Sequence, residues 1–142
     1  MKTKSIVFLL ALTFLACSIS PKPIDYGADG CHFCSMTIVD KQHAAQYVTK
    51  KGKAYKFDAS ECMLNQLKAV EGTTIALFLV NDYSNPGELV NATEATFLIS
   101  ENIPSPMGAN LSAFKSKEEA ERVHTANGGE LLTWAELTSK FN

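Results

Sequence analysis

Two thiols, an imidazole and a thioether lie within six residues of the chain. They belong to Cys31, His32, Cys34 and Met36. Thiolates and imidazoles bind metal ions, and two thiols separated by two residues can also exchange disulfides. A further thioether, that of Met107, lies in a loop among prolines and a glycine and not in a periodic apolar segment. These residue types predict a metal site or a redox site built mainly on sulfur.

Three interpretations of the Cys-x-x-Cys pair explain it incompletely. A structural disulfide between Cys31 and Cys34 closes so small a ring that it constrains the unfolded chain little. Thioredoxin-like redox catalysis needs the pair at a helix N-terminus, whereas here an expected strand, residues 37–39, follows it. Structural zinc usually takes two such pairs, and Cys62 is the one further thiol in the expected domain.

Cuprous copper is the fourth interpretation. Cu(I) is a soft ion that prefers thiolate and thioether ligands at low coordination number. Met36 follows Cys34 by two positions and offers a donor that zinc would not select. We therefore interpret Cys31, Cys34, Met36 and Met107 as candidate metal ligands. Met63 falls on the apolar face of an expected helix and is interpreted as part of the core.

The remaining histidines and Cys62 are weaker candidates. His32 lies inside the motif and could donate a nitrogen, whereas His43 follows a turn and is expected to be solvated. His124 lies on a helix rich in lysine and glutamate and is expected at the surface. Cys62 lies on an expected helix and is interpreted as a buried apolar side chain. No acid–base pair or nucleophile triad is evident, so the sequence predicts no enzyme.

The elements that must position these residues follow from apolar periodicity and from turn residues. The expected strands cover residues 37–39, 45–49, 54–57, 75–80, 89–90, 96–100 and 131–132. The expected helices begin at residues 58–60, 116 and 134, and Gly72 and Gly128-Gly129 end the first two.

A faint internal repeat organises these elements. Phe57 and Gly72 flank the first long helix, and Phe114 and Gly129 flank the second, each 57 positions later. The order strand, strand, helix, strand therefore occurs twice. Neither half could bury enough apolar surface alone, so the sequence predicts an α+β fold of two packed ββαβ modules.

The chain opens like a secreted lipoprotein. The apolar stretch 6–15 follows two lysines, is too short to span a membrane, and matches the h-region of a secretory signal. Ala16-Cys17 comes next and is similar to the bacterial lipobox, in which the cysteine carries the lipid. An ordinary signal peptide is the alternative. The expected parts are a signal peptide (1–16), a flexible tether from lipidated Cys17 (17–30) and an extracytoplasmic metal-binding domain (31–142).

Length and charge exclude other classes. A chain of 142 residues, 46% of them hydrophobic, can form one domain with a core and is not wholly disordered. The formal net charge is −2, and no basic block of the kind that follows phosphates is present. We expect no nucleic-acid partner. No apolar run reaches the roughly 20 residues of a membrane-spanning helix.

Two motifs resemble those of the NosL family, the lipoproteins that accompany nitrous oxide reductase. Residues 31–38, CHFCSMTI, are similar to the family signature Cys-x-x-Cys-Gly-Met-x-Ile, with Ser35 in place of the usual glycine. Residues 106–114, PMGANLSAF, are similar to the second motif, which precedes an acidic helix and Gly-Gly as it does here. The resemblance covers residues 29 to about 137.

This resemblance implies a membrane-anchored Cu(I) metallochaperone that delivers copper to nitrous oxide reductase or its maturation machinery in denitrification. The anchor would lie on the periplasmic side in a Gram-negative cell. The implied fold is two ββαβ modules related to part of the organomercurial lyase MerB. The resemblance implies copper ligation by Cys34 and Met36, by Met107 through its motif position, and less directly by Cys31. A membrane-tethered thiol–disulfide protein using Cys31 and Cys34, and a lipoprotein merely cross-linked by its cysteines, remain as alternatives.

Overall fold

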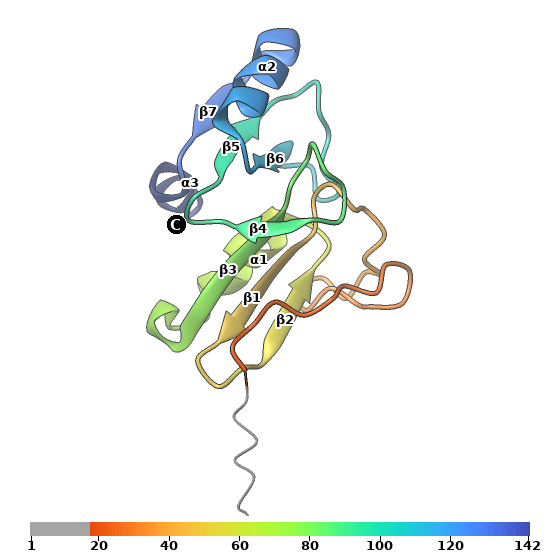
Figure 1. Ribbon diagram of the computed structural model, residues 1–142, viewed down its shortest axis with the longest axis vertical. Helices are drawn as coiled ribbons and strands as arrows, with labels where there is room; N and C mark the ends of the chain where they lie inside the picture. Colours follow the sequence, from red (N-terminus) through yellow and green to blue (C-terminus); the bar gives the residue numbers. More distant parts are fainter. Residues whose placement is uncertain (1–17) are drawn as a thin grey trace, which may run out of the picture.

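The fold is α+β, as the sequence predicts, and contains two antiparallel sheets (Figure 1). The computed structural model describes residues 18–142, so the signal segment and Cys17 lie outside the described residues. The elements in chain order are β1 (Ala45–Thr49), β2 (Ala54–Phe57), α1 (Ser60–Leu67), the 3-10 turn η1 (Gly72–Thr74), β3 (Ile75–Asn81), β4 (Leu89–Asn91), β5 (Thr96–Ile99), β6 (Leu111–Phe114), α2 (Lys117–Asn127), β7 (Glu130–Leu132) and α3 (Trp134–Phe141).

The first sheet has the strand order β2-β1-β3-β4. β1 is central and buried, and its Tyr47 lies opposite Tyr55 of β2 on one side and Phe78 of β3 on the other. The rings of Tyr47 and Tyr55 are 4.9 Å apart, and Phe57 lies 5.4 Å from Tyr47. Aromatic side chains on neighbouring strands bury large apolar areas, so this hairpin forms a rigid support for the residues that follow Phe57.

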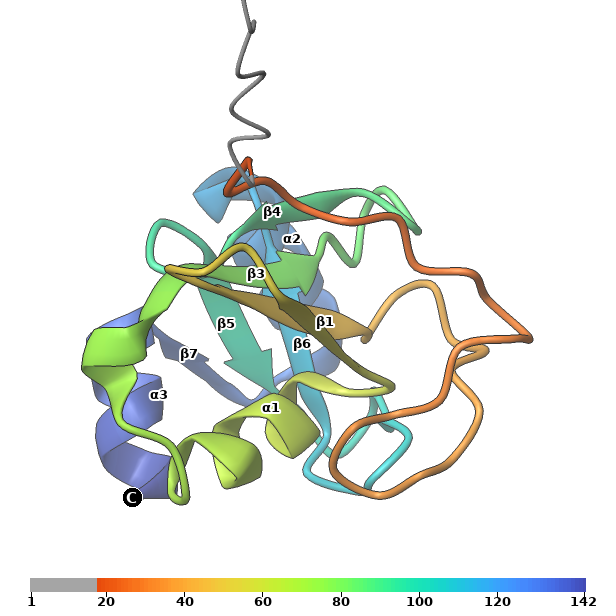
Figure 2. The same ribbon diagram turned by 90° about the horizontal axis from the view of Figure 1, so that it is seen from below.

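The second sheet has the strand order β6-β5-β7. α2 packs against all three of these strands, whereas α3 packs against β5, β7 and α1 and so connects the two halves. Figure 1 shows α2 at the opposite end of the molecule from the β1–β2 turn, and Figure 2 shows α1 and α3 beside each other. One main core of buried side chains, including Phe57 and Phe97, runs through both modules.

The internal repeat is confirmed in the structure. β2 covers residues 54–57 and β6 covers residues 111–114, while α1 begins at residue 60 and α2 at residue 117, so both elements are offset by 57 positions. The two modules are β1-β2-α1-β3 and β5-β6-α2-β7. Phe57 and Phe114 end equivalent strands and are both fully buried.

The strand expected at residues 89–90 is present as β4, whereas the one expected at residues 37–39 does not form and β6 was not expected. Residues 89–91 pair with β3 in the first sheet, and the first partner of β5 is instead β6, which the apolar pattern did not indicate. All four residues of β6 are buried, Ser112 included, so the strand shows no alternation. Residues 37–39 form no strand, because their backbone pairs locally: Thr37 bridges Gly30, and the N–H of Ile38 donates to Asp29 (2.9 Å).

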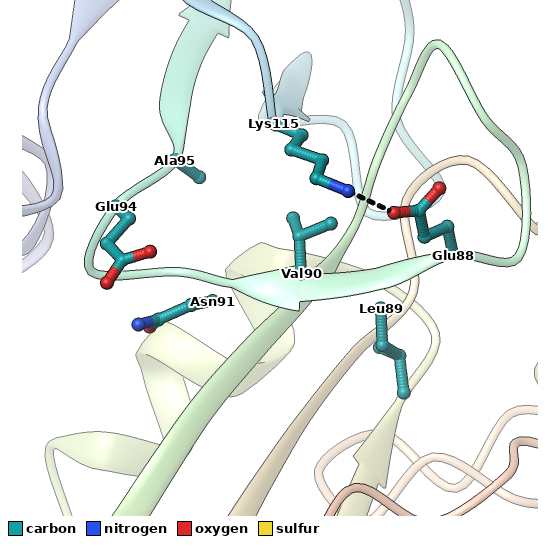
Figure 3. Close-up of a pocket in the computed structure, with 7 residues that line it drawn as sticks. All are labelled: Glu88, Leu89, Val90, Asn91, Glu94, Ala95 and Lys115. Carbon is teal, nitrogen blue, oxygen red and sulfur yellow. Dashed lines mark hydrogen bonds and ion pairs between the residues drawn. The ribbon is translucent and has the colours of Figure 1, made fainter.

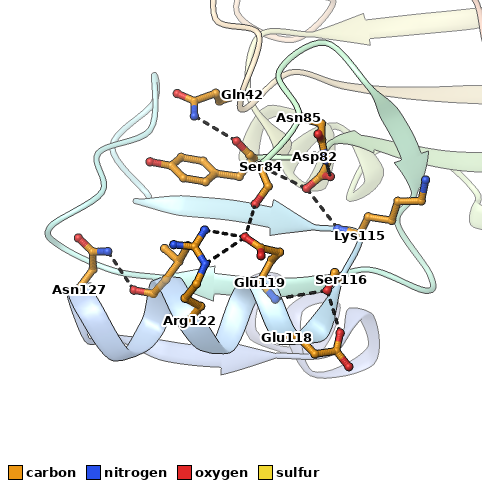
Figure 4. A network of polar contacts seen from close by, with 12 residues as sticks. Gln42, Asp82, Ser84, Asn85, Lys115, Ser116, Glu118, Glu119, Arg122 and Asn127 are labelled. Carbon is orange, nitrogen blue, oxygen red and sulfur yellow. Dashed lines mark hydrogen bonds and ion pairs between the residues drawn. The ribbon is translucent and has the colours of Figure 1, made fainter.

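Polar contacts join the two modules where β3 ends. The Oδ1 of Asp82 accepts a hydrogen bond from the backbone N–H of Lys115, which follows β6 (3.3 Å). The Lys115 ammonium reaches Glu88 at 2.7 Å across the hollow between β4 and β5 (Figure 3). The hydroxyl of Ser84 donates to Glu119 on α2 (3.4 Å; Figure 4). The loop between β3 and β4 is thereby held against the second module.

The segment before residue 31 contacts the folded domain. The backbone N–H of Lys22 donates to Oε1 of Gln46, and Nε2 of Gln46 donates to the Lys22 carbonyl, each at 2.8 Å. The Tyr26 hydroxyl accepts from Nδ2 of Asn81 at 2.6 Å. Gln46 and Asn81 are buried on β1 and β3, so these bonds attach residues 22–26 to the first sheet. Among the helices of residues 18–142, none has the length and apolarity needed to cross a membrane.

Candidate metal centre

Three thiols and one carboxylate converge on a single point. The Sγ atoms of Cys31, Cys34 and Cys62 and a carboxylate oxygen of Asp58 all lie within 4.8 Å of one another. Cys31, Cys62 and Asp58 are buried, and Cys34 is half-buried. These residues come from the loop before β1, from the β2–α1 junction and from the first turn of α1.

A closed loop presents the first two thiols. The N–H of Cys31 donates to the Met36 carbonyl (2.7 Å), and the N–H of Ser35 donates to the Cys31 carbonyl (2.9 Å). The N–H of His32 donates to the carbonyl of Lys56 at the end of β2 (2.8 Å), which attaches the loop to the first sheet. Ser35 adopts φ +65°, a left-handed conformation that glycine reaches without strain. The serine in place of the family glycine therefore stands where the loop needs that conformation.

The third thiol and the carboxylate come from the β2–α1 junction. Asp58 is one residue past β2, and its Oδ1 accepts a hydrogen bond from Sγ of Cys34 at 3.5 Å. The sequence pattern favoured Asp58 as a helix-start residue, but the N-cap of α1 is Ala59, which makes no side-chain cap. Cys62, interpreted from the sequence as a buried apolar side chain, is buried as expected and also directs its sulfur into the cluster.

The three thiols have unequal acidities. The S–H of Cys62 donates to the Cys31 thiolate, and with backbone N–H groups of Cys34 and Asp58 it lowers the pKa of Cys31 to about 6. That hydrogen bond, together with burial, raises the pKa of Cys62. Burial raises the pKa of Cys34 as well. The structure therefore assigns the thiolate to Cys31, with two protonated thiols beside it.

The spacing of this cluster fits one bound ion. Metal–sulfur bonds of about 2.3 Å allow two sulfur ligands of one ion to lie at most about 4.6 Å apart. The separations here, all within 4.8 Å, need little change to meet that limit. Three thiolates suit a soft ion such as Cu(I), and three thiolates with a carboxylate could also hold Zn²⁺.

The two candidate thioether ligands lie at the surface. Met36 is 53% exposed and Met107 is 42% exposed, whereas Met63 on α1 is fully buried, as its interpretation as a core residue requires. Neither exposed methionine fills space in the core. The ring of His32 packs against Tyr55 at 4.5 Å, and the side chain is exposed.

A buried carboxylate holds the loop that carries Met107. Glu61 lies beside Cys62 on α1 and accepts a hydrogen bond from the hydroxyl of Ser105. The same hydroxyl accepts from the backbone N–H of Asn110 at 2.9 Å. Glu61 is 2% exposed, and its other oxygen, Oε2, has no hydrogen-bond partner among the described residues. Sequence reasoning missed this link, because no local pattern pairs two residues 44 positions apart.

His43 is not solvated, contrary to the expectation from its turn. The side chain is 4% exposed, its Nδ1 lies 2.9 Å from Asp40 and its Nε2 lies 3.2 Å from the hydroxyl of Ser112. The order Asp, His, Ser is that of a nucleophile triad. Ser112 is only 1% exposed, however, so no substrate reaches its hydroxyl. These contacts attach the turn before β1 to β6.

Fold and site together define an α+β protein with a buried cluster of thiols of the kind that binds soft metal ions. The chain belongs to the NosL family, whose sequence model matches residues 23–141. It is similar to the "Copper-binding lipoprotein NosL" of Stutzerimonas stutzeri, with 26% identity over 120 residues. That alignment covers 79% of this chain and 63% of the relative, so the chain spans less than two thirds of the relative's length.

A solved structure shares the fold. The crystal structure of the copper chaperone NosL from Shewanella denitrificans superposes with a TM-score of 0.73 at 23% sequence identity. The match covers 84% of this chain and 96% of that one. At this identity the likeness establishes the fold, and it confirms the α+β arrangement predicted from the sequence.

Proposed function

We propose that the protein is a membrane-anchored chaperone that binds Cu(I) outside the cytoplasm and delivers it to nitrous oxide reductase. The convergence of three thiols within 4.8 Å is the observation that carries the proposal. The family and the names of the two relatives favour copper as the metal. In this role the protein catalyses no reaction of its own.

The proposed resting site uses the thiolates of Cys31, Cys34 and Cys62. Cu(I) prefers sulfur over oxygen, so the Asp58 carboxylate is left to orient Cys34 through the hydrogen bond they share. Cys31 is already a thiolate near neutral pH, whereas Cys34 and Cys62 carry protons. Binding to all three sulfurs therefore releases two protons.

Release is proposed to proceed through the exposed sulfurs. Cys34 is half-buried, and Met36 follows it on the same loop with 53% of its side chain exposed. A neutral thioether binds Cu(I) more weakly than a thiolate. An ion that has passed from the thiolates to the methionines is therefore open to displacement by an acceptor's ligands, one methionine at a time. Met36 and Met107 then act as transfer ligands, and the buried thiols retain the ion between encounters.

An anaerobic titration against a chromophoric Cu(I) chelator tests the resting site. Replacement of Cys31 or Cys34 by serine is expected to weaken Cu(I) binding at least 100-fold, about 2.7 kcal/mol. Met63→Leu is the matched control, because Met63 is fully buried in the core and leucine preserves its volume. Zn²⁺ binding as tight as that of Cu(I) would instead identify a structural zinc site.

Delivery and anchoring need separate measurements. Copper-loaded protein is expected to transfer its metal to copper-free nitrous oxide reductase. The transfer is measured by the appearance of the enzyme's copper absorption. Cys17 lies outside the described residues; Cys17→Ser is expected to abolish lipid attachment, detected by mass spectrometry of the membrane fraction. A Cys17→Ser protein that still carries lipid would refute the proposed anchor.

A thiol–disulfide function is the alternative. It would use Cys31 and Cys34, but the pair lies in a loop closed by Gly30 and Thr37 and does not begin a helix. A helix N-terminus activates the thiolate of thioredoxin-like proteins, whereas here the Cys31 thiolate is stabilised by a hydrogen bond from Cys62, a thiol outside the pair. Turnover of a disulfide substrate by the reduced, copper-free protein would favour this alternative over the chaperone.

A further inference from the structure

Three lysines crowd the turn between β1 and β2. Lys50, Lys51 and Lys53 are exposed, and together with Tyr55 and Thr74 they line a shallow hollow. The N–H of Lys50 donates to the carbonyl of Thr74 (2.9 Å), so η1 lies beside the turn. The ammonium of Lys53 lies 4.6 Å from the centre of the Tyr55 ring. The turn therefore presents a group of positive charges on a supported surface.

Charge is distributed unequally along the length of the molecule. Residues 18–81 carry seven lysines and six acidic residues, two of which, Asp58 and Glu61, are buried. Residues 82–142 carry four basic and nine acidic residues. Several of these acids lie on α2, where Figure 4 shows Glu118 and Glu119, and α2 is at the end opposite the β1–β2 turn. The domain has a basic end and an acidic end.

The described chain begins at the basic end. Figure 1 shows its first residues at the same end of the domain as the β1–β2 turn. Lys22 is fixed to Gln46 of β1 by two hydrogen bonds of 2.8 Å. Residues 18–21 alone separate Lys22 from Cys17, and fully extended they span at most about 17 Å. A lipid on Cys17 would keep the basic end close to the bilayer.

We propose that the turn Lys50–Lys53 rests on the anionic phospholipid headgroups of the membrane in which the protein is anchored. This inference rests on the lipid anchor of the proposed function. Each lysine near an anionic surface strengthens binding about five-fold, so three contribute on the order of 100-fold. Screening confines the attraction to about 10 Å, which selects the basic end, and the acidic end is repelled from the surface. Residues 25–40 lie at the side of the domain, away from the β1–β2 turn (Figure 1).

Lysine footprinting on vesicles tests this orientation. The mature lipoprotein is inserted into vesicles of phosphatidylcholine, with or without 30% phosphatidylglycerol, and treated briefly with an amine-acylating reagent. Mass spectrometry then measures the modification of each lysine. We expect phosphatidylglycerol to lower the modification of Lys50, Lys51 and Lys53 at least five-fold. Lys117 and Lys140, exposed in the second module, are the internal controls and are expected to react equally on both vesicles.

A charge-removing variant completes the test. The triple variant Lys50→Gln, Lys51→Gln, Lys53→Gln is expected to bind copper like the parent. On phosphatidylglycerol vesicles the parent is expected to protect the backbone amides of the β1–β2 turn from hydrogen exchange. The triple variant is expected to lose this protection. Equal footprints on the two vesicle types, with the protein still sedimenting with both, would overturn the orientation and leave the anchor intact.

Failure of the anchor gives a different result. A chain without lipid does not sediment with pure phosphatidylcholine vesicles. Sedimentation of that chain with phosphatidylglycerol vesicles, lost in the triple variant and at 0.5 M salt, would still support the lysine surface. No sedimentation with either vesicle type would overturn it. Copper titration of the same sample reports on the metal site independently.

Discussion

Replacement of Cys62 distinguishes its two possible contributions to the metal centre, as a ligand and as a hydrogen-bond donor. Its S–H donates to the Cys31 thiolate and is the main reason that the pKa of Cys31 falls from 9.0 to about 6. Alanine removes both the donor and the sulfur. Serine restores a donor but provides no soft ligand.

The size of the donor effect follows from this pKa. At pH 7 a thiol with a pKa of about 6 is roughly nine-tenths thiolate, and one with a pKa of about 9 is roughly one-hundredth thiolate. If loss of the hydrogen bond from Cys62 returned the pKa of Cys31 to its ordinary value of 9.0, binding at pH 7 would weaken about 100-fold. Above pH 9 either thiol is at least half ionised, and the difference falls to about two-fold. Any larger loss at high pH comes from ligation.

The assay is competitive Cu(I) titration of Cys62→Ala and Cys62→Ser at pH 7 and pH 9.5 without oxygen. If Cys62 is a ligand, both variants bind at least 100-fold more weakly at both pH values. Parent-like binding of Cys62→Ala at pH 9.5 would refute ligation and leave Cys62 as a donor alone. Cys62 is 1% exposed, so alanine leaves a small cavity. Unfolding of the copper-free variant is the control for the fold, and we expect its free energy of unfolding to fall by only about 1 kcal/mol.

Three further predictions concern the loops around the site. Met36→Leu and Met107→Leu are each expected to slow copper transfer to an acceptor at least several-fold in stopped-flow mixing. Their free energies of unfolding are expected to stay within about 1.5 kcal/mol of the parent. Transfer at the parent rate would exclude the thioethers from the transfer route. Ser35→Gly is expected to keep or raise stability by up to about 1 kcal/mol, and Ser35→Val to lower it by more than 1 kcal/mol, because φ is +65°; thermal melting of both decides. Ser105→Ala removes the donor to the buried carboxylate of Glu61 and is expected to cost about 2–4 kcal/mol in urea unfolding, so a cost below 0.5 kcal/mol would show that the bond contributes little.

Local patterns were sufficient for the elements that have strong periodicity. The β1–β2 hairpin, β3, α2 and α3 lie where apolar spacing and turn residues indicate them, and α1 begins where expected but ends at Leu67, before Gly72. β6 was missed because all four of its residues are buried, Ser112 among them, which removes the alternation that marks a strand. The 57-residue repeat could have found it, since β6 lies one repeat after β2.

The site was only partly predictable. The Cys-x-x-Cys pair indicates soft-metal or redox chemistry by itself, because both thiols are local in sequence. Cys62 and Asp58 meet the Cys-x-x-Cys pair only in the tertiary structure, because β2 brings the start of α1 next to the loop that carries the pair. His43 was misjudged for a similar reason: its burial depends on Ser112, 69 positions away. Contacts at such separations depend on tertiary packing, which hydrophobic periodicity does not encode.

The duplicated β-strand and helix place equivalent positions in two different environments, so substitutions there are not equally tolerated. Positions 58 and 62 in the first module correspond by the 57-residue offset to Lys115 and Glu119 in the second. In one copy these positions face a buried cluster of sulfur, whereas in the other they carry exposed ion pairs to Glu88 and Arg122. Exposed pairs of this kind contribute little to stability. Substitutions at positions 115 and 119 are therefore expected to be tolerated better than substitutions at positions 58 and 62, whose side chains form the buried cluster.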